Sequence, residues 1–204
     1  MTAGIAHEFR NGLATIHGYS RLLPPKKLQA EYRPYVEGIC QETVALREMV
    51  DNSLNLARPA ELGLATVSLK RLVERAKRGG HVTVRGEFPE IEGDEVLLRQ
   101  AVSNLCRNAV DACLSAGGPP EITLEGSVDY EHGQTTLVIV DNGAGFEPEQ
   151  GERMFWPFFT TKSGGTGLGL ALTQKIVVTH NGRVTASLSK SGEGMEVVLP
   201  LQRV

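Results

Sequence analysis

The spacing of apolar residues changes near Arg58, and this change limits the possible folds of the chain more than any other feature. Before it, two segments advance in alternating steps of three and four residues, the repeat of helices packed in a left-handed bundle. Pro24 and Pro25 end the first helix, because proline lacks the backbone N–H. The spacing predicts an antiparallel helical hairpin, with the second helix over residues 27–57. The repeating positions are Ala6, Phe9, Leu13, Ile16, Ser20 and Leu23 in the first helix, and Val36, Ile39, Thr43, Leu46, Val50, Ser53 and Ala57 in the second.

A hairpin of this kind leaves one apolar face on each helix without a partner. Two copies bury these faces together when they pair into a four-helix bundle. We therefore predict a homodimer through residues 1–57. The alternative is a hairpin that folds back on the second half of its own chain.

Residues 59–204 contain short segments in which apolar and polar residues alternate, and longer segments in which apolar residues have helical spacing. Ser68 and Asp94 are predicted N-caps of helices over residues 69–78 and 95–115, and a third helix is predicted over 167–180. Helices and mostly antiparallel strands favour an α/β sandwich with the helices on one face of the sheet. The predicted fold class is α+β, with a helical hairpin over residues 1–58 and a sandwich over residues 59–204. Strands are predicted over residues 81–88, 122–128, 135–140, 183–188 and 195–201.

The composition excludes several classes of protein. The 21 Lys and Arg against 24 Asp and Glu give a net charge of −3, so no basic field indicates nucleic-acid binding. No apolar run approaches the roughly 18 residues that cross a bilayer, and the N-terminus lacks a signal-peptide pattern. The three cysteines show neither a CxxC pair nor metal-ligand spacing, which argues against a disulfide framework. We expect a soluble, cytoplasmic chain with buried free thiols.

Two polar clusters could bind a ligand through oxygen atoms or a close backbone approach. Asn104, Asn108 and Asp111 are spaced by four and three residues, so they share one stripe of the long helix. Their oxygens suit Mg²⁺ held between protein and phosphates, and the alternative is a solvated polar stripe. Asp141 ends an apolar strand, and Gly143 and Gly145 after it permit the backbone to approach a flat ligand. The alternative for this second cluster is a plain turn.

Glycines at positions 164, 165, 167 and 169 open the last predicted helix. Backbone N–H groups exposed at a helix N-terminus favour phosphate, and the alternative is a flexible loop without a ligand. The glycines follow a loop instead of a strand, so they do not fit a dinucleotide-binding unit. Near the start of the chain, His7 and Asn11 are four residues apart and both point outward from the predicted seam. Taken alone, they are ordinary surface residues.

Together and in this order, these clusters resemble the cytoplasmic core of bacterial sensor histidine kinases of two-component systems. Residues 7–13, His-Glu-Phe-Arg-Asn-Gly-Leu, are similar to the phosphoacceptor box on the dimerisation helices. Residues 104–109 resemble the asparagine box, 141–145 the first glycine box, 155–162 the phenylalanine box and 165–170 the second glycine box. Five collinear motifs at family spacing are specific, and they span nearly the whole chain.

The resemblance implies that the sandwich binds ATP with Mg²⁺, as a domain of the type shared with gyrase and heat-shock chaperone ATPases. Asp141 is expected to accept a hydrogen bond from the adenine amino group, and Asn108 to bind Mg²⁺ through its amide oxygen. Backbone N–H groups of residues 166–168 are expected to hold the phosphates, with residues 147–164 as a mobile lid. The expected ATP-binding residues are Asn104, Arg107, Asn108, Asp111, Asp141, Gly143, Gly145, Lys162, Gly165, Thr166, Gly167, Leu168 and Gly169.

The resemblance also implies three catalytic residues in the first helix. His7 is the expected nucleophile on the γ-phosphorus, and Glu8 the expected general base or orienting partner of the imidazole. Asn11 is expected to orient a water that dephosphorylates the partner, the receiver domain of a response regulator. Transfer then requires the ATP-binding domain to swing on a hinge near residues 58–63. Gly12 stands where many members carry proline, which lowers local helix stability by roughly 1 kcal/mol but leaves the acceptor untouched.

Asn104 bears on the type of reaction. The resemblance implies that related ATPases carry a glutamate there to activate water, and an amide cannot act as a base. Hydrolysis is therefore expected to be slow, with the phosphoryl group passing to His7. Two alternatives remain open, a related ATPase or serine kinase and a catalytically silent dimeric scaffold. The resemblance implies that the chain is the core of a longer protein, and the sequence leaves open whether that parent is anchored in a membrane.

Overall fold

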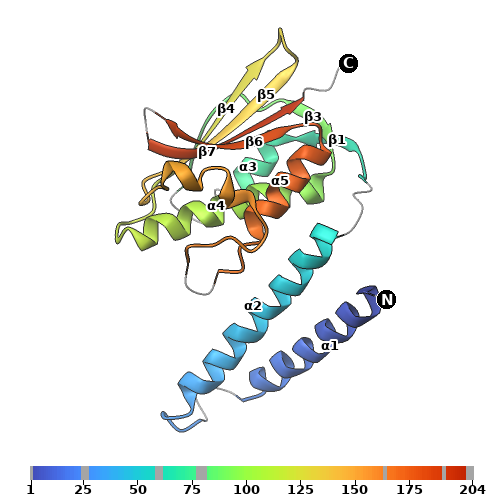
Figure 1. The fold of residues 1–204 in the computed structure, drawn as a ribbon, viewed down its shortest axis with the longest axis vertical. Coiled ribbons are helices and arrows are strands. Elements are labelled where there is room, and N and C mark those ends of the chain that lie inside the picture. Colours follow the sequence, from blue (N-terminus) through green and yellow to red (C-terminus); the bar gives the residue numbers. More distant parts are fainter. Residues whose placement is uncertain are drawn as a thin grey trace. The chain divides into compact units, whose positions relative to one another are not determined.

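The chain divides into two compact units, Met1–Arg58 and Pro59–Val204 (Figure 1). The structure is a computed structural model that describes residues 2–23, 28–57, 62–76, 82–162, 165–189 and 192–200. Within these ranges the backbone alone is described for residues 2–8, 148, 187–189 and 192–198. Among the described helices, none is both long enough and apolar enough to cross a bilayer.

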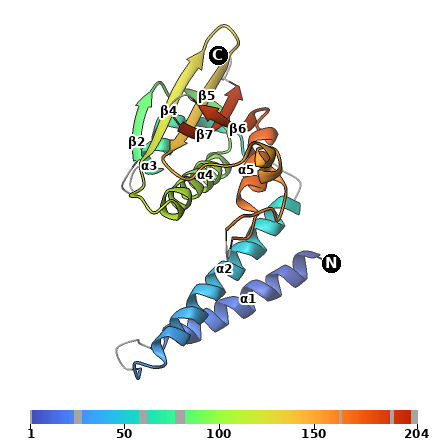
Figure 2. The same cartoon turned by 60° about the vertical axis from the view of Figure 1, so that its left-hand side comes forward.

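The first unit is a hairpin of helices α1 (Thr2–Arg21) and α2 (Arg33–Ala57), which lie side by side (Figures 1 and 2). The prediction that the second helix begins at residue 27 is wrong, since α2 begins at Arg33. Pro34 explains the difference. A proline inside a helix lacks the N–H and clashes with the carbonyl four residues earlier, so it is tolerated only in the first turn.

The inner face of the hairpin is partly polar. An ion pair joins Arg10 of α1 to Asp51 of α2. Ten residues further along α1, Ser20 Oγ accepts a hydrogen bond from the Cys40 thiol of α2 at 3.0 Å. Thr43 Oγ1 lies 3.4 Å from His17 Nδ1 and donates to the Ile39 carbonyl at 2.8 Å. Ser20 and Thr43 are buried within the single hairpin, so these two seam positions face the other helix of the same chain.

Other positions of the predicted seam remain uncovered by the hairpin. Phe9 is 60% exposed and Ile16 is 49% exposed on α1, while Ile39 is 46% exposed on α2. Large apolar side chains repeated along one helix face are costly to leave in water. The single hairpin therefore leaves an apolar face on each helix, as the heptad spacing predicts.

The second unit is a sheet covered on one face by helices α3 (Leu69–Ala76), α4 (Glu95–Ser115) and α5 (Gly169–Thr179) (Figures 1 and 2). The order of its five strands is β2-β4-β5-β7-β6, and only the β2–β4 pair is parallel. The predicted α+β class and the single helical face are confirmed. The strands are β2 (Val82–Gly86), β4 (Ile122–Asp129), β5 (Gln134–Asp141), β6 (Arg183–Ser189) and β7 (Gly192–Pro200).

Two further strands were not predicted. Strands β1 (Ala65–Ser68) and β3 (Glu90–Gly93) form a separate antiparallel pair. Each has four residues, too few for an alternating pattern to stand out, and their pairing joins segments about 25 residues apart. Strand β7 begins at Gly192, three residues before the predicted start. Its glycines have low strand propensity, but pairing with both β5 and β6 satisfies the backbone groups.

Helix α4 supplies most of the helical side of the core. Asp94 caps it as predicted, with Oδ1 accepting the N–H groups of Val96 at 3.0 Å and Leu97 at 3.1 Å. Cys106 and Cys113 of this helix are buried and free, as predicted, and burial raises the pKa of the Cys106 thiol to about 11. The apolar residues on the buried face of α4 are Leu98, Ala101, Val102, Leu105, Ala109 and Cys113.

Gly86 is the position of the sheet least able to accept a side chain. Its φ is +97°, and a Cβ there would lie 2.0 Å from the carbonyl oxygen of Gly126, its partner in β4. We expect Gly86→Ala to lower the free energy of unfolding by about 3 kcal/mol, from backbone strain and the clash together. Gly117→Ala is the matched control, because Gly117 has φ +81° and open space around its Cβ position. Denaturant unfolding should show a loss of about 1 kcal/mol for the control; equal losses would contradict the role of the clash.

Candidate functional site

The stripe Asn104, Asn108 and Asp111 on α4 forms the centre of the candidate site. Asn104 is 5% exposed, while Asn108 and Asp111 are half-buried. The Asn104 amide nitrogen donates to the Gly169 carbonyl at 3.3 Å, and its oxygen accepts a hydrogen bond from Arg107 at 3.0 Å. Asn104 thus joins the middle of α4 to the first residue of α5.

Lys162 reaches the other two residues of this stripe. Its Nζ lies 2.9 Å from Asp111 Oδ2 and 3.4 Å from Asn108 Oδ1. The sequence predicted all three as ATP-binding residues, and the structure brings them together across about 50 positions of the chain. Amide and carboxylate oxygens that face a cation are of the hard type that Mg²⁺ prefers, so this part of the site fits the ion. No group of three or more His, Cys, Asp or Glu side chains of metal-binding geometry occurs within the described ranges.

The loop after β5 passes close to the same helix. Gly143 donates its N–H to Asp141 Oδ1 at 2.9 Å, which makes a tight turn at the strand end. A Cβ on Gly143 would lie 2.6 Å from the Cβ of Ala112, so the loop can pass α4 only with glycine at this position. Gly145 has φ +71°, where glycine is also favoured. Ala112 was not predicted as a site residue, because its role depends entirely on what packs against it.

The side chain of Asn142 anchors this loop to a neighbouring segment. Its Oδ1 accepts the Glu121 N–H at 3.0 Å, and its Nδ2 donates to the Pro119 carbonyl at 3.1 Å. These bonds fasten the end of β5 to the segment before β4. Asn142, the middle residue of the Asp-Asn-Gly turn, therefore stabilises the loop. Asp141, the first residue of the turn, is half-buried beside α4.

The second glycine segment is shaped by contacts with the aromatic residues before it. Gly167 has φ +64°, and a Cβ there would lie 2.5 Å from the Phe158 carbonyl carbon. Its carbonyl accepts the Phe158 N–H at 3.0 Å. Because a left-handed residue cannot belong to a helix, α5 begins at Gly169 and not at 167 as predicted. Leu168 is fully buried and packs into the core beneath this turn.

Gly165 lies at the other end of the same turn. Its N–H donates to the Lys162 carbonyl at 3.2 Å, and a Cβ on it would lie 2.6 Å from Thr160 Oγ1. Thr166 Oγ1 accepts the Leu168 N–H at 3.4 Å. The glycine turn and Lys162 are thus parts of one local structure next to α4.

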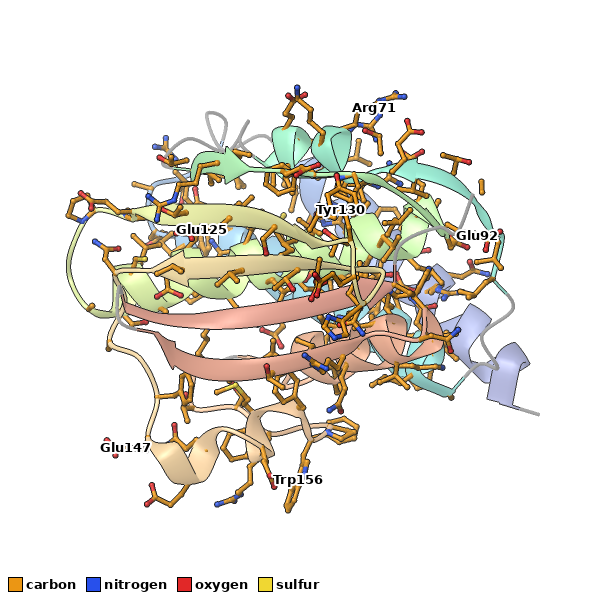
Figure 3. All side chains as sticks on the ribbon, turned by 90° about the horizontal axis from the view of Figure 1, so that it is seen from above. Arg71, Glu92, Glu125, Tyr130, Glu147 and Trp156 are labelled. Carbon is orange, nitrogen blue, oxygen red and sulfur yellow. The ribbon has the colours of Figure 1, made fainter. Side chains whose placement is uncertain are left out.

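The aromatic segment of residues 155–159 precedes this turn in the chain. Phe155 is buried, whereas Trp156 and Phe158 are 59% and 68% exposed. The Arg153 guanidinium lies 5.9 Å from the centre of the Trp156 ring and 5.0 Å from that of Phe159. Figure 3 shows Trp156 and Glu147 on the segment that projects away from the sheet. Arg153 was missed in the sequence, where only the run of aromatic residues after it signals the cluster.

His7, Glu8 and Asn11 lie on α1, in the other unit. The side chains of His7 and Glu8 are outside the described residues, so their predicted exposure stays a prediction. Asn11 is exposed, and its carbonyl accepts the Thr15 hydroxyl at 2.9 Å. The expected hinge near residues 58–63 is also outside the described residues except for its last two.

Two family models match the chain. Residues 1–62 match the His Kinase A (phospho-acceptor) domain, and residues 93–203 match the histidine kinase-, DNA gyrase B-, and HSP90-like ATPase. The second match covers more than half of the chain and includes every residue predicted to bind ATP.

Curated relatives carry both parts. The signal transduction histidine-protein kinase AtoS of Escherichia coli is 33% identical over 98% of this chain and 34% of its own length. The sensor histidine kinase ZraS of Salmonella typhimurium is 31% identical over 98% of this chain and 45% of its own. The chain thus spans about a third to a half of these relatives.

Solved structures agree with the fold. The full-length protein ShkA, in complex with AMPPNP, aligns with a TM-score of 0.78 and 27% identity over 100% of this chain and 46% of that one. The histidine kinase ThkA, in complex with the response regulator protein TrrA, aligns with a TM-score of 0.69 over 99% of this chain and 61% of that one. At 24% identity, the second comparison supports the fold alone.

Proposed function

The chain belongs to the histidine kinase family, and on this premise we propose that it binds Mg-ATP, phosphorylates His7 and passes the phosphoryl group to a response regulator. The observation that carries the proposal is the meeting of α4 with the glycine turn. Asn104 bonds to Gly169, and Asn108 and Asp111 contact Lys162. The loop at Gly143 passes Ala112 of the same helix, so three predicted ligand segments adjoin α4.

The nucleotide is held by groups from each of these segments. Asp141, next to α4, accepts a hydrogen bond from the adenine amino group, which favours adenine over guanine. Backbone N–H groups of Thr166, Gly167 and Leu168 hold the phosphates at the start of α5, where the helix dipole favours negative charge. Asn108 would hold Mg²⁺ through its amide oxygen, and the ion would supply positive charge beside the phosphates. Lys162 adds a second positive charge there.

The transfer step forms one bond and breaks another. A ring nitrogen of His7 attacks the γ-phosphorus, the N–P bond forms, the bond to the bridging oxygen breaks, and ADP leaves. Glu8 accepts or orients the proton on the other ring nitrogen. An aspartate of the response regulator then takes the phosphoryl group from His7. In the reverse role, Asn11 orients a water toward the aspartyl phosphate.

The environment of Asn104 favours transfer over hydrolysis. Its amide is 5% exposed, and both its nitrogen and its oxygen are hydrogen-bonded. An amide cannot take a proton from water, so this position offers no general base for attack on ATP. This supports a kinase over the related ATPases that carry a carboxylate there.

Labelled ATP tests the proposal. The protein is incubated with γ-labelled ATP and Mg²⁺, and the label is followed on the protein in acid and in base. We expect a phosphoprotein that survives base, is lost in acid and donates its label to a receiver domain. Acid-stable label would point to a serine kinase, ATP consumption without a phosphoprotein to an ATPase, and inertness to a scaffold; each result would refute the proposal.

We also propose that the exposed face of the hairpin pairs with a second copy. Ile16 is 49% exposed and repeats at heptad spacing with Phe9, which is 60% exposed. Ile16→Glu places two charges in the interface of such a dimer, so we expect the mass in solution to fall toward the 22.1 kDa of one chain. Ala14→Glu is the matched control, because Ala14 lies on the opposite side of α1 and is exposed. Dissociation by both variants, or a wild type that is already monomeric, would contradict the proposed interface.

A further inference from the structure

A buried histidine, His180, links the N-terminal end of α4 to the C-terminal end of α5. The backbone N–H of Asp94 donates to His180 Nε2 at 2.9 Å, and His180 Nδ1 lies 2.7 Å from the Ile176 carbonyl oxygen. Because Nε2 accepts from an N–H, it carries no proton, and Nδ1 carries the proton that it donates to Ile176. His180 is 5% exposed. A neutral imidazole thus ties the first turn of α4 to the last turn of α5.

The carboxylate of Asp94 joins a third segment to this point. One oxygen, Oδ1, caps α4 by accepting the N–H groups of Val96 and Leu97. The other, Oδ2, accepts the N–H of Gly63 at 3.1 Å. Gly63 comes six residues after the end of α2, where the chain enters the second unit. We call Gly63, Asp94 and His180 the entry junction.

The packing around the entry junction leaves little freedom. A Cβ on Gly93 would lie 2.7 Å from Leu98 Cδ1 and 3.0 Å from His180 Cδ2, so the imidazole rests directly on the backbone before Asp94. A Cβ on Gly63 would lie 3.4 Å from Asp94 Oδ2. The entering chain and the end of α5 therefore both contact the N-terminal cap of α4.

One helix held here, α4, carries the stripe Asn104, Asn108 and Asp111, and the other, α5, begins directly after the glycine turn. Asn104 lies ten residues after Asp94, about 15 Å along α4, and contacts Gly169 at the start of α5. The helices are therefore tied at two points, at the candidate site by Asn104 and at the entry junction by His180. Gly63 is bonded to the residue that caps α4, the helix on which Asn104 lies.

We propose that Asp94 is a positioning residue for phosphoryl transfer, which fixes the entering chain at Gly63 to the helix that carries the nucleotide groups. The inference rests on the proposed kinase function, since it concerns how ATP is presented to His7. It does not require Asp94 to contact ATP. Loss of the Asp94–Gly63 bond should therefore slow transfer and leave ATP affinity unchanged.

Asp94→Asn separates this role from capping. Asparagine caps a helix as well as aspartate does, so Oδ1 can keep the bonds to Val96 and Leu97. Its amide nitrogen is a donor and cannot accept the Gly63 N–H. Asp94→Ser also keeps a cap and loses the second oxygen. Glu95→Gln is the matched control, because it removes a charge one residue away that pairs with Arg75 and not with Gly63.

Two measurements on the full chain test the inference. The first is amide hydrogen exchange: in Asp94→Asn the Gly63 amide should exchange at least tenfold faster, with Val96 and Leu97 unchanged. This result does not depend on kinase activity, and unchanged exchange at Gly63 would overturn the inference.

The second measurement is single-turnover phosphorylation at saturating ATP. We expect a rate at least fivefold lower for Asp94→Asn and Asp94→Ser, with ATP affinity within twofold of the wild type and of Glu95→Gln. An unchanged rate, or a loss of ATP affinity that matches the loss of rate, would overturn the inference. Failure of the wild type to form phosphohistidine would refute the proposed kinase function instead, while the exchange result would still stand.

Discussion

Replacing His7 by glutamine is expected to reduce the acid-labile phosphoprotein to below detection. Glutamine is similar in size and suits a helix, so α1 should remain folded. Its amide nitrogen is not a nucleophile, whereas a neutral imidazole nitrogen is one near physiological pH. The measurement is the label that the protein retains in base after incubation with γ-labelled ATP and Mg²⁺. ATP affinity should be unchanged, since His7 and the nucleotide groups lie in different units of the chain.

His17→Gln is the matched control for this substitution. His17 lies on the same helix, ten residues further along, and its Nδ1 lies 3.4 Å from Thr43 Oγ1 on the inner face of the hairpin. We expect His17→Gln to keep the phosphoprotein. Label that persists in His7→Gln and disappears in His17→Gln would show that the acceptor is His17 and not His7. Label that persists in both variants would exclude the mechanism.

Replacing Asp141 by asparagine is expected to weaken ATP binding by roughly 10- to 150-fold, the loss of a hydrogen bond to a charged group worth about 1.5–3 kcal/mol. The substitution spares the loop, because an asparagine oxygen can still accept the Gly143 N–H, which lies 2.9 Å from Asp141 Oδ1. It also places an amide donor where the adenine amino group must itself donate. Isothermal titration with ATP and with GTP measures the effect, and the preference for ATP over GTP should shrink.

Asp129→Asn is the matched control for the Asp141 variant. Asp129 ends β4 and bonds to His132 at 2.7 Å, an exposed pair at the opposite end of the strand from Ile122, the residue that pairs with Asp141. ATP affinity should therefore be unchanged by Asp129→Asn. Wild-type affinity in Asp141→Asn would contradict the role of Asp141 in base recognition. An equal loss in both variants would show that the effect is one of net charge alone.

The local features of this protein were predictable from sequence. Heptad spacing predicts both helices of the hairpin, and Asp94 and Ser68 occupy the cap positions that their side chains predict. The offsets between Asn104, Asn108 and Asp111 place them on one stripe of α4. Each prediction depends on residues within one or two helical turns, where the geometry of a helix is set by the backbone itself.

Other elements escaped prediction because their reasons are not local. Strands β1 and β3 are too short to show a pattern and exist through their pairing with each other. The start of α2 is an exception, since Pro34 marks it locally and the prediction overlooked that signal. The requirement for glycine at position 143 comes from Ala112, which lies 31 positions earlier in the chain.

The sequence by itself determined the class of the fold, the collinear motifs and the helix that carries the asparagine stripe, because periodicity and spacing act over a few residues. Only the tertiary structure decided which groups meet. Lys162 reaches Asp111 across 51 positions, and His180 reaches the backbone of Asp94 across 86. The packing of distant segments against one another sets these contacts, and no local pattern records which atoms that packing brings within hydrogen-bonding distance.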